Sequence, residues 1–229
     1  MSERTSFPAR NGNPTDGVLR EPPGSGKAPA LVLVQEYWGV NAHIVDLTER
    51  FAAEGFLVLA PDLYHGKLTK DPAEASKLMT SLDRAQAVSD IAGAVAFLAK
   101  HPRCTGKVGI TGFCLGGAYA FTAAALVPGL SAAVPFYGIP DATKVDLGAI
   151  AIPVQAHFSR TDPWAKPELA EGVKKALDAK HVPMELHVYD AQHAFMNDTR
   201  PEVHDAALAK VAWGRAVSFL KSNLQQGAA

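Results

Sequence analysis

The chain has 229 residues, of which 48% are hydrophobic, with 22 basic and 23 acidic side chains. This length suits one α/β domain with a substantial core. The balanced charge argues against a nucleic acid or an anionic membrane surface as a partner and favours a small molecule. The N-terminal residues lack the apolar core of a signal peptide, and no later segment approaches the roughly 20 apolar residues of a membrane span, so a cytoplasmic protein is expected.

Residues 1–28 are polar and rich in Gly and Pro, which predicts an irregular lead-in or an edge hairpin. The stretch Gly24–Lys27 is similar to a phosphate loop only superficially, because Ala28 stands where Ser or Thr is required and a strand follows. Residues 29–222 are predicted to form a single α/β domain, and residues 223–229 a C-terminal tail.

Six short runs of continuous apolar residues, largely β-branched or aromatic, are typical of strands covered on both faces. They are Ala30–Val34, Phe56–Ala60, Lys107–Thr111, Ala132–Phe136, Ile152–Ala156 and Glu185–Tyr189. Helical patterns lie between them. One follows a candidate N-cap at Asn41, and one long segment carries an apolar face from Leu78 to Leu98 after a capping signal at Asp71–Glu74. Two more helices are predicted over residues 168–177 and 206–220. The alternation predicts a mostly parallel, doubly wound sheet with helices on both faces.

The third apolar run breaks at Gly112-Phe-Cys-Leu-Gly116 and passes into an alanine-rich helical pattern. This pattern is typical of a nucleophile elbow, here with Cys114 in the position of the usual serine, and glycines flank the turn because larger side chains would collide there. As a thiolate, Cys114 would be a nucleophile for acyl transfer. The alternative is that Cys114 is a small buried hydrophobe, as most free cysteines are.

Two further residues follow in the order that an elbow enzyme requires, which favours the catalytic reading. Asp162 comes just after the strand-like run 154–158, and His193 just after the run 184–189. The other cysteine, Cys104, lies at the opposite end of a six-residue strand from Cys114, roughly 20 Å away, so both are predicted to be free thiols, which suits a reducing compartment.

Glu36 stands at the carboxyl end of the first predicted core strand, facing the crevice where such sheets bind ligands. It could bond to the loop backbone, or it could act on the Cys114 thiol. His65 could border the same pocket or be a solvated loop residue. The histidines show no ligand spacing with carboxylates or Cys104, so no metal or other cofactor is predicted.

The stretches Gln35–Asn41, Pro61–Tyr64 and Gly112–Gly117, with the contexts of Asp162 and His193, resemble the dienelactone hydrolase family over residues 28–221. The resemblance implies an α/β-hydrolase fold that opens enol-lactones with a Cys-Asp-His triad. It makes Cys114 the nucleophile, His193 the general base and then acid, and Asp162 the group that orients the imidazole. It also implies that Glu36 hydrogen-bonds the resting thiol and helps to ionise it when substrate arrives. The backbone N–H groups of Leu115 and Tyr37 would form the oxyanion hole, as in elbow enzymes generally.

Aromatic residues that flank these positions are expected to wall an acyl pocket, although core packing explains Phe113 equally well. They are Trp38, Tyr64, Phe113, Trp164 and Phe195. The family's two arginines for a substrate carboxylate are missing, and Asn197 stands at one of their positions. Lys77, Arg84, Arg160 and Arg200 are the candidate replacements.

The sequence therefore predicts a hydrolase that opens a lactone or small ester through a thioester on Cys114. One alternative is a general carboxylesterase or thioesterase that acts on neutral substrates. A second is a non-catalytic ligand-binding homologue, against which the complete triad argues. The sequence does not define the oligomeric state, and a monomer is favoured.

Overall fold

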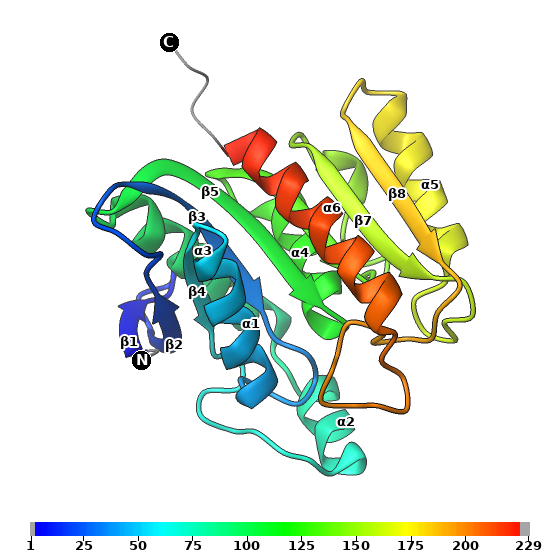
Figure 1. Cartoon of the computed structure of the whole chain (residues 1–229), viewed down its shortest axis with the longest axis horizontal. Coiled ribbons are helices and arrows are strands. Elements are labelled where there is room, and N and C mark those ends of the chain that lie inside the picture. The colour runs from blue at the N-terminus through cyan, green and yellow to red at the C-terminus, as the bar shows by residue number, and fades with distance from the viewer. Residues whose placement is uncertain (1–2, 225–229) are drawn as a thin grey trace.

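The strands form one eight-stranded sheet in the computed structural model, which describes residues 3–224 (Figure 1). The strand order is β1-β2-β4-β3-β5-β6-β7-β8. The six strands from β3 onward run parallel to one another, as predicted. They are β3 (Ala28–Val34), β4 (Leu57–Pro61), β5 (Cys104–Phe113), β6 (Leu130–Phe136), β7 (Val154–Ser159) and β8 (Met184–Tyr189).

The N-terminal segment forms the hairpin, which was one of its two predicted alternatives. Strand β1 (Glu3–Pro8) pairs with β2 (Pro14–Arg20), and β2 then pairs with β4, both in antiparallel fashion. At the other end of the chain, residues 223 and 224 of the predicted tail belong to the last helix, while residues 225–229 lie outside the described part of the chain, as do residues 1 and 2.

Helices cover both faces of the sheet. On one face lie α3 (Arg84–Lys100), α4 (Leu115–Leu126) and α5 (Pro167–Asp178), and on the other lie α1 (Ala42–Ala53) and α6 (Ala206–Leu224). Two buried apolar clusters fill the space between these helices and the sheet. No helix among residues 3–224 is long and apolar enough to cross a membrane.

The long helix predicted around Leu78 to Leu98 is wrong in one respect, because the structure divides it into α2 (Pro72–Thr80) and α3. The Asp83 side chain accepts hydrogen bonds from the N–H groups of Ala85 and Gln86, so it starts a new helix where the apolar periodicity runs on. The predicted caps at Asn41 and Asp71 both form.

The carboxyl ends of the parallel strands meet at one edge of the sheet, at the bottom and lower right of Figure 1. Strand β3 leads to Glu36, β5 to Cys114, β7 to Asp162 and β8 to His193. The topology therefore gathers four residues that are far apart in the sequence.

Candidate active site

Cys114 occupies a strained turn between β5 and α4. Its φ of 56° is unfavourable for a residue with a side chain. A Cβ on Gly112 would lie 2.3 Å from the carbonyl oxygen of Gly116, and one on Gly116 would lie 2.2 Å from the carbonyl oxygen of Val34. Neither position tolerates a larger residue, so the glycines let the turn approach β3 and raise the thiol at the end of the sheet.

His193 connects the acid and the thiol. Its Nδ1 lies 2.6 Å from Oδ2 of Asp162, whose Oδ1 accepts the N–H groups of Trp164 and Ala165, each at 2.9 Å. Because Nδ1 is engaged by Asp162, Nε2 is the nitrogen left for the thiol. Burial lowers the pKa of His193, but the interactions with Asp162 and Cys114 outweigh it and raise that pKa to about 10. The three residues are therefore electrostatically coupled.

Glu36 lies beside this unit but does not bond to the thiol. The side chain is 2% exposed, and burial raises its pKa, although the hydrogen bond from Asn197 and the charge of His193 act in the opposite direction. Asn197 Nδ2 donates to Glu36 Oε2 at 2.7 Å, whereas Oε1 has no hydrogen-bond partner among the described residues. The structure thus places Glu36 where sequence predicted it, with a different partner from the one that the resemblance implies.

Two backbone amides are the candidates for the oxyanion hole. Tyr37 follows Glu36 at the end of β3, and Leu115 is the first residue of α4, directly after Cys114. No hydrogen bond from either amide to another residue is present within the described range. The position of Leu115 at a helix N-terminus favours negative charge on a bound oxygen.

The predicted aromatic wall divides into two groups. Trp164 is 74% exposed and meets the His193 ring edge-on at 5.0 Å, and Trp38 is half-buried against Tyr37. Tyr64 is buried, and its pKa is raised first by burial and then by Cys114.

The other two aromatic residues are fully buried. Phe113 stacks on Phe136, and Phe195 packs on Tyr137. Both are therefore core residues, which for Phe113 was one of its two predicted roles.

Tyr137 is a site residue that the sequence analysis missed. It follows β6, is fully buried, has a φ of 33°, and meets His193 edge-on at 5.2 Å between ring centroids. Burial raises its pKa well above the ordinary value, with Glu36 and Cys114 adding to the effect. Its place directly after an apolar run, at the same edge as the other strand ends, was the available signal.

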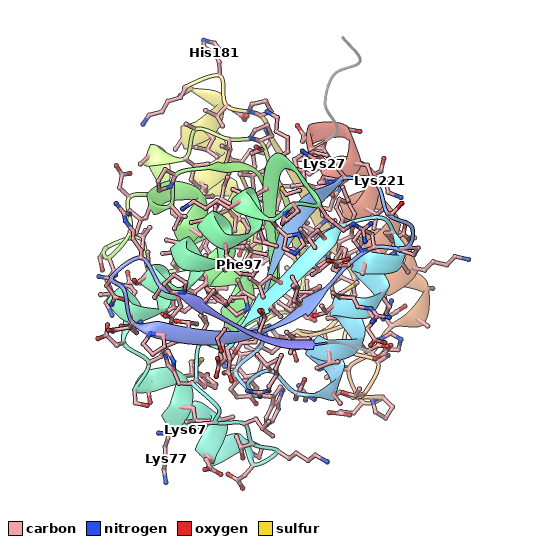
Figure 2. The ribbon with its side chains drawn as sticks, turned by 90° about the vertical axis from the view of Figure 1, so that its left-hand side faces the viewer. Lys27, Lys67, Lys77, Phe97, His181 and Lys221 are labelled. Atoms are coloured by element: carbon pink, nitrogen blue, oxygen red, sulfur yellow. The ribbon has the colours of Figure 1, made fainter. Side chains whose placement is uncertain are left out.

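Among the four candidate cations, only Arg200 has a charge that acts on Glu36, Tyr37 and Tyr137. Its guanidinium lies 5.8 Å from the Trp38 ring centroid. Of the other three, Arg84 donates to the carbonyl of Lys144, Arg160 pairs with Asp190, and Lys77 is exposed and projects outward in Figure 2.

His65 is an exposed loop residue, which was one of its two predicted alternatives, and its Nε2 lies 3.1 Å from Oδ2 of the buried Asp90. Within residues 3–224 no group of three His, Cys, Asp or Glu side chains could hold a metal ion.

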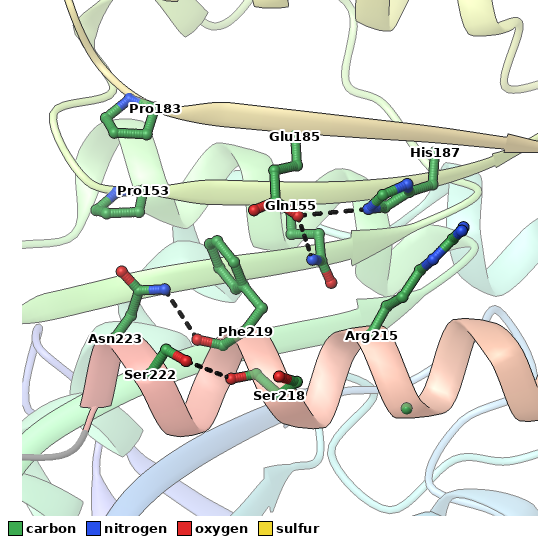
Figure 3. A pocket seen from close by; sticks show the side chains of 11 residues that line it. Pro153, Gln155, Pro183, Glu185, His187, Arg215, Ser218, Phe219, Ser222 and Asn223 are labelled. Atoms are coloured by element: carbon green, nitrogen blue, oxygen red, sulfur yellow. Dashed lines mark hydrogen bonds and ion pairs between the residues drawn. The ribbon is translucent and has the colours of Figure 1, made fainter.

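A cleft of about 570 Å³ lies over β7 and β8 beside α6, away from the triad (Figure 3). Figure 3 shows Arg215 and His187 at one end of it and Pro153 and Pro183 at the other. His187 is paired with Glu185, and among the lining residues no nucleophilic side chain is paired with a base.

Comparisons with known proteins agree with this geometry. The model of the dienelactone hydrolase family matches residues 15–224. The Usf protein of Aquifex pyrophilus is 35% identical over 233 residues, which cover 98% of this chain and 100% of that protein. A carboxymethylenebutenolidase from a Pseudomonas species is 30% identical, over 96% of this chain and 95% of its own. The solved structure of a candidate dienelactone hydrolase from Klebsiella pneumoniae superposes with a TM-score of 0.83 at 30% identity, covering 95% of this chain and 97% of that one. The predicted α/β-hydrolase fold is confirmed.

Proposed function

The chain belongs to the dienelactone hydrolase family and is a carboxylic ester hydrolase, and from this we propose that it opens a lactone or small ester through a thioester on Cys114. The observation that supports the proposal most directly is the imidazole of His193, which is bonded at 2.6 Å to Asp162 and whose pKa is raised by both Asp162 and Cys114. A non-catalytic binding protein has no need of this matched set.

In the first half of the reaction the Cys114 thiolate attacks the substrate carbonyl carbon. A C–S bond forms and the carbonyl electron pair moves onto oxygen, where the N–H groups of Leu115 and Tyr37 stabilise the charge. The tetrahedral intermediate collapses, the C–O bond breaks, and the His193 imidazolium protonates the leaving oxygen. In a lactone this oxygen stays attached to the acyl chain, so the ring opens without releasing a fragment.

In the second half a water molecule attacks the thioester while His193 takes its proton. The C–S bond breaks, Cys114 recovers its proton from the imidazolium or remains paired with it, and the carboxylic acid leaves. Asp162 keeps Nδ1 of the ring protonated and so aims Nε2 at the sulfur. Burial raises the pKa of Glu36, and the positive charge of the His193 imidazolium acts in the opposite direction, so a protonated ring favours an ionised Glu36.

The alternative substrate class is a neutral aryl or alkyl ester. The exposed Trp164 ring beside His193 and the amide at Asn197 both favour it, because neither binds a carboxylate as an arginine does.

We also propose a cytoplasmic location, which the free thiols of Cys104 and Cys114 support. A monomer stays a prediction.

Trapping the acyl-enzyme tests the mechanism. Incubation with an activated aryl ester and rapid acid quenching should add one acyl mass to the peptide that contains Cys114, and Cys114→Ala should lose both the adduct and essentially all turnover. Cys104→Ser is the matched control, because this buried thiol lies at the far end of β5, and it should retain both. Full turnover by Cys114→Ala would exclude the covalent mechanism.

A further inference from the structure

The cleft beside α6 lies where the edge of the sheet is left partly uncovered. Strand β8 is the last strand in the sheet order, and α5 packs against one of its faces, whereas α6 packs mainly on β5 and β6 across the other face. The cleft volume of about 570 Å³ is within the range of roughly 300–1,000 Å³ that is typical of small-molecule sites. None of its lining residues belongs to the candidate active site, so it is a separate candidate for binding.

The floor of the cleft carries polar side chains from both strands. In the register of β7 and β8, Gln155 lies opposite Glu185, and His157 lies opposite His187. Alternate residues of a strand share a face, so these four side chains lie on the same face of the sheet. His157 is fully buried, and a buried polar group is costly unless it is hydrogen-bonded.

These side chains form one directed chain of hydrogen bonds. Gln155 Nε2 donates to Glu185 Oε2 at 2.5 Å, so the amide oxygen faces His157 and accepts from its Nε2 at 3.0 Å. Burial lowers the pKa of His157 well below its ordinary value, so the ring is neutral and its Nδ1 accepts from the Tyr189 hydroxyl at 2.9 Å. The Tyr189 oxygen in turn accepts from Arg215 Nη1 at 3.2 Å. The neutral groups therefore satisfy one another, and the charges of Arg215 and Glu185 stand at the two ends of the chain.

Arg215 carries a positive charge that no carboxylate neutralises. Its hydrogen bond and its cation–π contact of 5.6 Å are both with Tyr189, and within residues 3–224 it forms no ion pair. The charge of Arg215 acts on His187, which lines the same end of the cleft (Figure 3). By contrast, Glu185 is bonded to Gln155 and paired with His187 at 3.4 Å. The cationic end therefore has N–H donors left for a ligand.

The other end of the cleft is apolar. Pro153 and Pro183 line it, and Figure 3 shows the Phe219 ring projecting from α6 toward the strands. A cation at one end and apolar side chains at the other match a molecule that has an anionic head group and an apolar body.

We propose that this cleft binds an organic carboxylate, with the head group on Arg215 and His187 and the apolar body against Phe219 and the two prolines. The carboxylate accepts charge-assisted hydrogen bonds from the guanidinium. Glu185 opposes this binding, because its negative charge lies on the same side of the cleft as the head group. This binding site goes beyond the proposed hydrolysis and does not depend on it.

Titration of the full-length protein with octanoate, followed through the proton–carbon NMR signals of the histidine rings, tests the proposal. The His187 signals, identified by their loss in His187→Gln, should shift in a saturable way. Octan-1-ol has the same chain length without the charge and should bind at least tenfold more weakly. The His193 signals report separately on octanoate that reaches the triad. His187 signals that do not shift, or equal affinities for acid and alcohol, would overturn the proposal.

Gly214→Leu blocks the cleft directly. Gly214 lines it, and a Cβ at this position would meet nothing within 4 Å. The added side chain should occupy the cleft and weaken octanoate binding at least tenfold, while leucine suits a helix better than glycine does. Gly172→Leu is the matched control, because this glycine is equally open but lies on α5 at the other face of the sheet, and it should bind octanoate like the parent. Equal affinities of the two variants would contradict the proposal.

Two charge variants test the ends of the chain of hydrogen bonds. Arg215→Gln should weaken octanoate binding about tenfold, whereas Glu185→Gln should bind octanoate at least as tightly as the parent, because a like charge has been removed. Unchanged affinity in Arg215→Gln, or weaker binding in Glu185→Gln, would refute the assignment of the head group. Should Arg215→Gln not fold, the pair of glycine variants gives the answer. Cys114→Ala should bind octanoate like the parent, so this proposal and the proposed function fail separately.

Discussion

Replacing Asp162 by Asn tests the triad most sharply, because the structure dictates how the new amide must lie. Oδ1 of Asp162 accepts two backbone N–H groups at 2.9 Å, so the oxygen of the amide stays there and its NH₂ group must face Nδ1 of His193. Two donors cannot bond to each other. The ring is therefore driven to the tautomer with its proton on Nε2, where it cannot accept the thiol proton.

The size of the effect follows from the electrostatics of His193. Its pKa of about 10 against an ordinary value of 6.5 corresponds to roughly 5 kcal/mol of net stabilisation of the imidazolium. Asp162 and Cys114 supply it together against the cost of burial. If about half comes from Asp162, the loss is about 2–3 kcal/mol, in the range of a hydrogen bond between charged groups. Adding the unfavourable tautomer, kcat should fall by about 10²- to 10⁴-fold.

The assay is kcat/KM for an aryl ester as a function of pH. Removing a negative charge that raises the pKa of His193 must lower that pKa. The alkaline limit of activity, which we expect near the His193 pKa of about 10 in the parent protein, should therefore move down by about two pH units. Asp190→Asn is the matched control, because that carboxylate is exposed, pairs with Arg160 in the adjacent loop, and should cost little. Activity within tenfold of the parent, with the alkaline limit unmoved, would refute the reasoning.

Two further substitutions probe the elbow and the substrate. Gly116→Ala places a Cβ 2.2 Å from the Val34 carbonyl oxygen and should lower the free energy of unfolding by about 3 kcal/mol in urea titrations. The control is Gly172→Ala in α5, where nothing lies within 4 Å of the added Cβ; it should be neutral or stabilising by up to about 1 kcal/mol. Equal stability of the two variants would contradict the packing argument. Arg200→Gln should lower kcat/KM for a lactone bearing a free carboxylate and should leave kcat/KM for its methyl ester unchanged. The loss should be only about tenfold, because the Arg200 side chain is partly exposed. Equal effects on acid and ester, or an equal loss in Arg160→Gln, would show that Arg200 does not bind the carboxylate.

Local patterns were enough to predict the parallel sheet, the elbow and the strand ends that carry Asp162 and His193, because each depends on residues close in sequence. The break between α2 and α3 was not predicted, since apolar periodicity continues across it and one capping side chain decides the boundary. The partner of Glu36 was not predictable either. It is Asn197, 161 positions away, and such a pairing is set only when β8 and the following loop have packed beside β3 and β5.

The spread of the site over four strand ends has a consequence for how the protein is made. Cys114 leaves the ribosome well before Asp162 and His193, and a nascent chain that ends between them carries a thiol with neither a base nor an acid. Since contacts of such long sequence separation form late in folding, the proposed mechanism requires that hydrolysis begin only when β8 has docked on β7. The first turnover of a newly synthesised chain would therefore report completion of the entire sheet, and truncated chains released early would be catalytically silent.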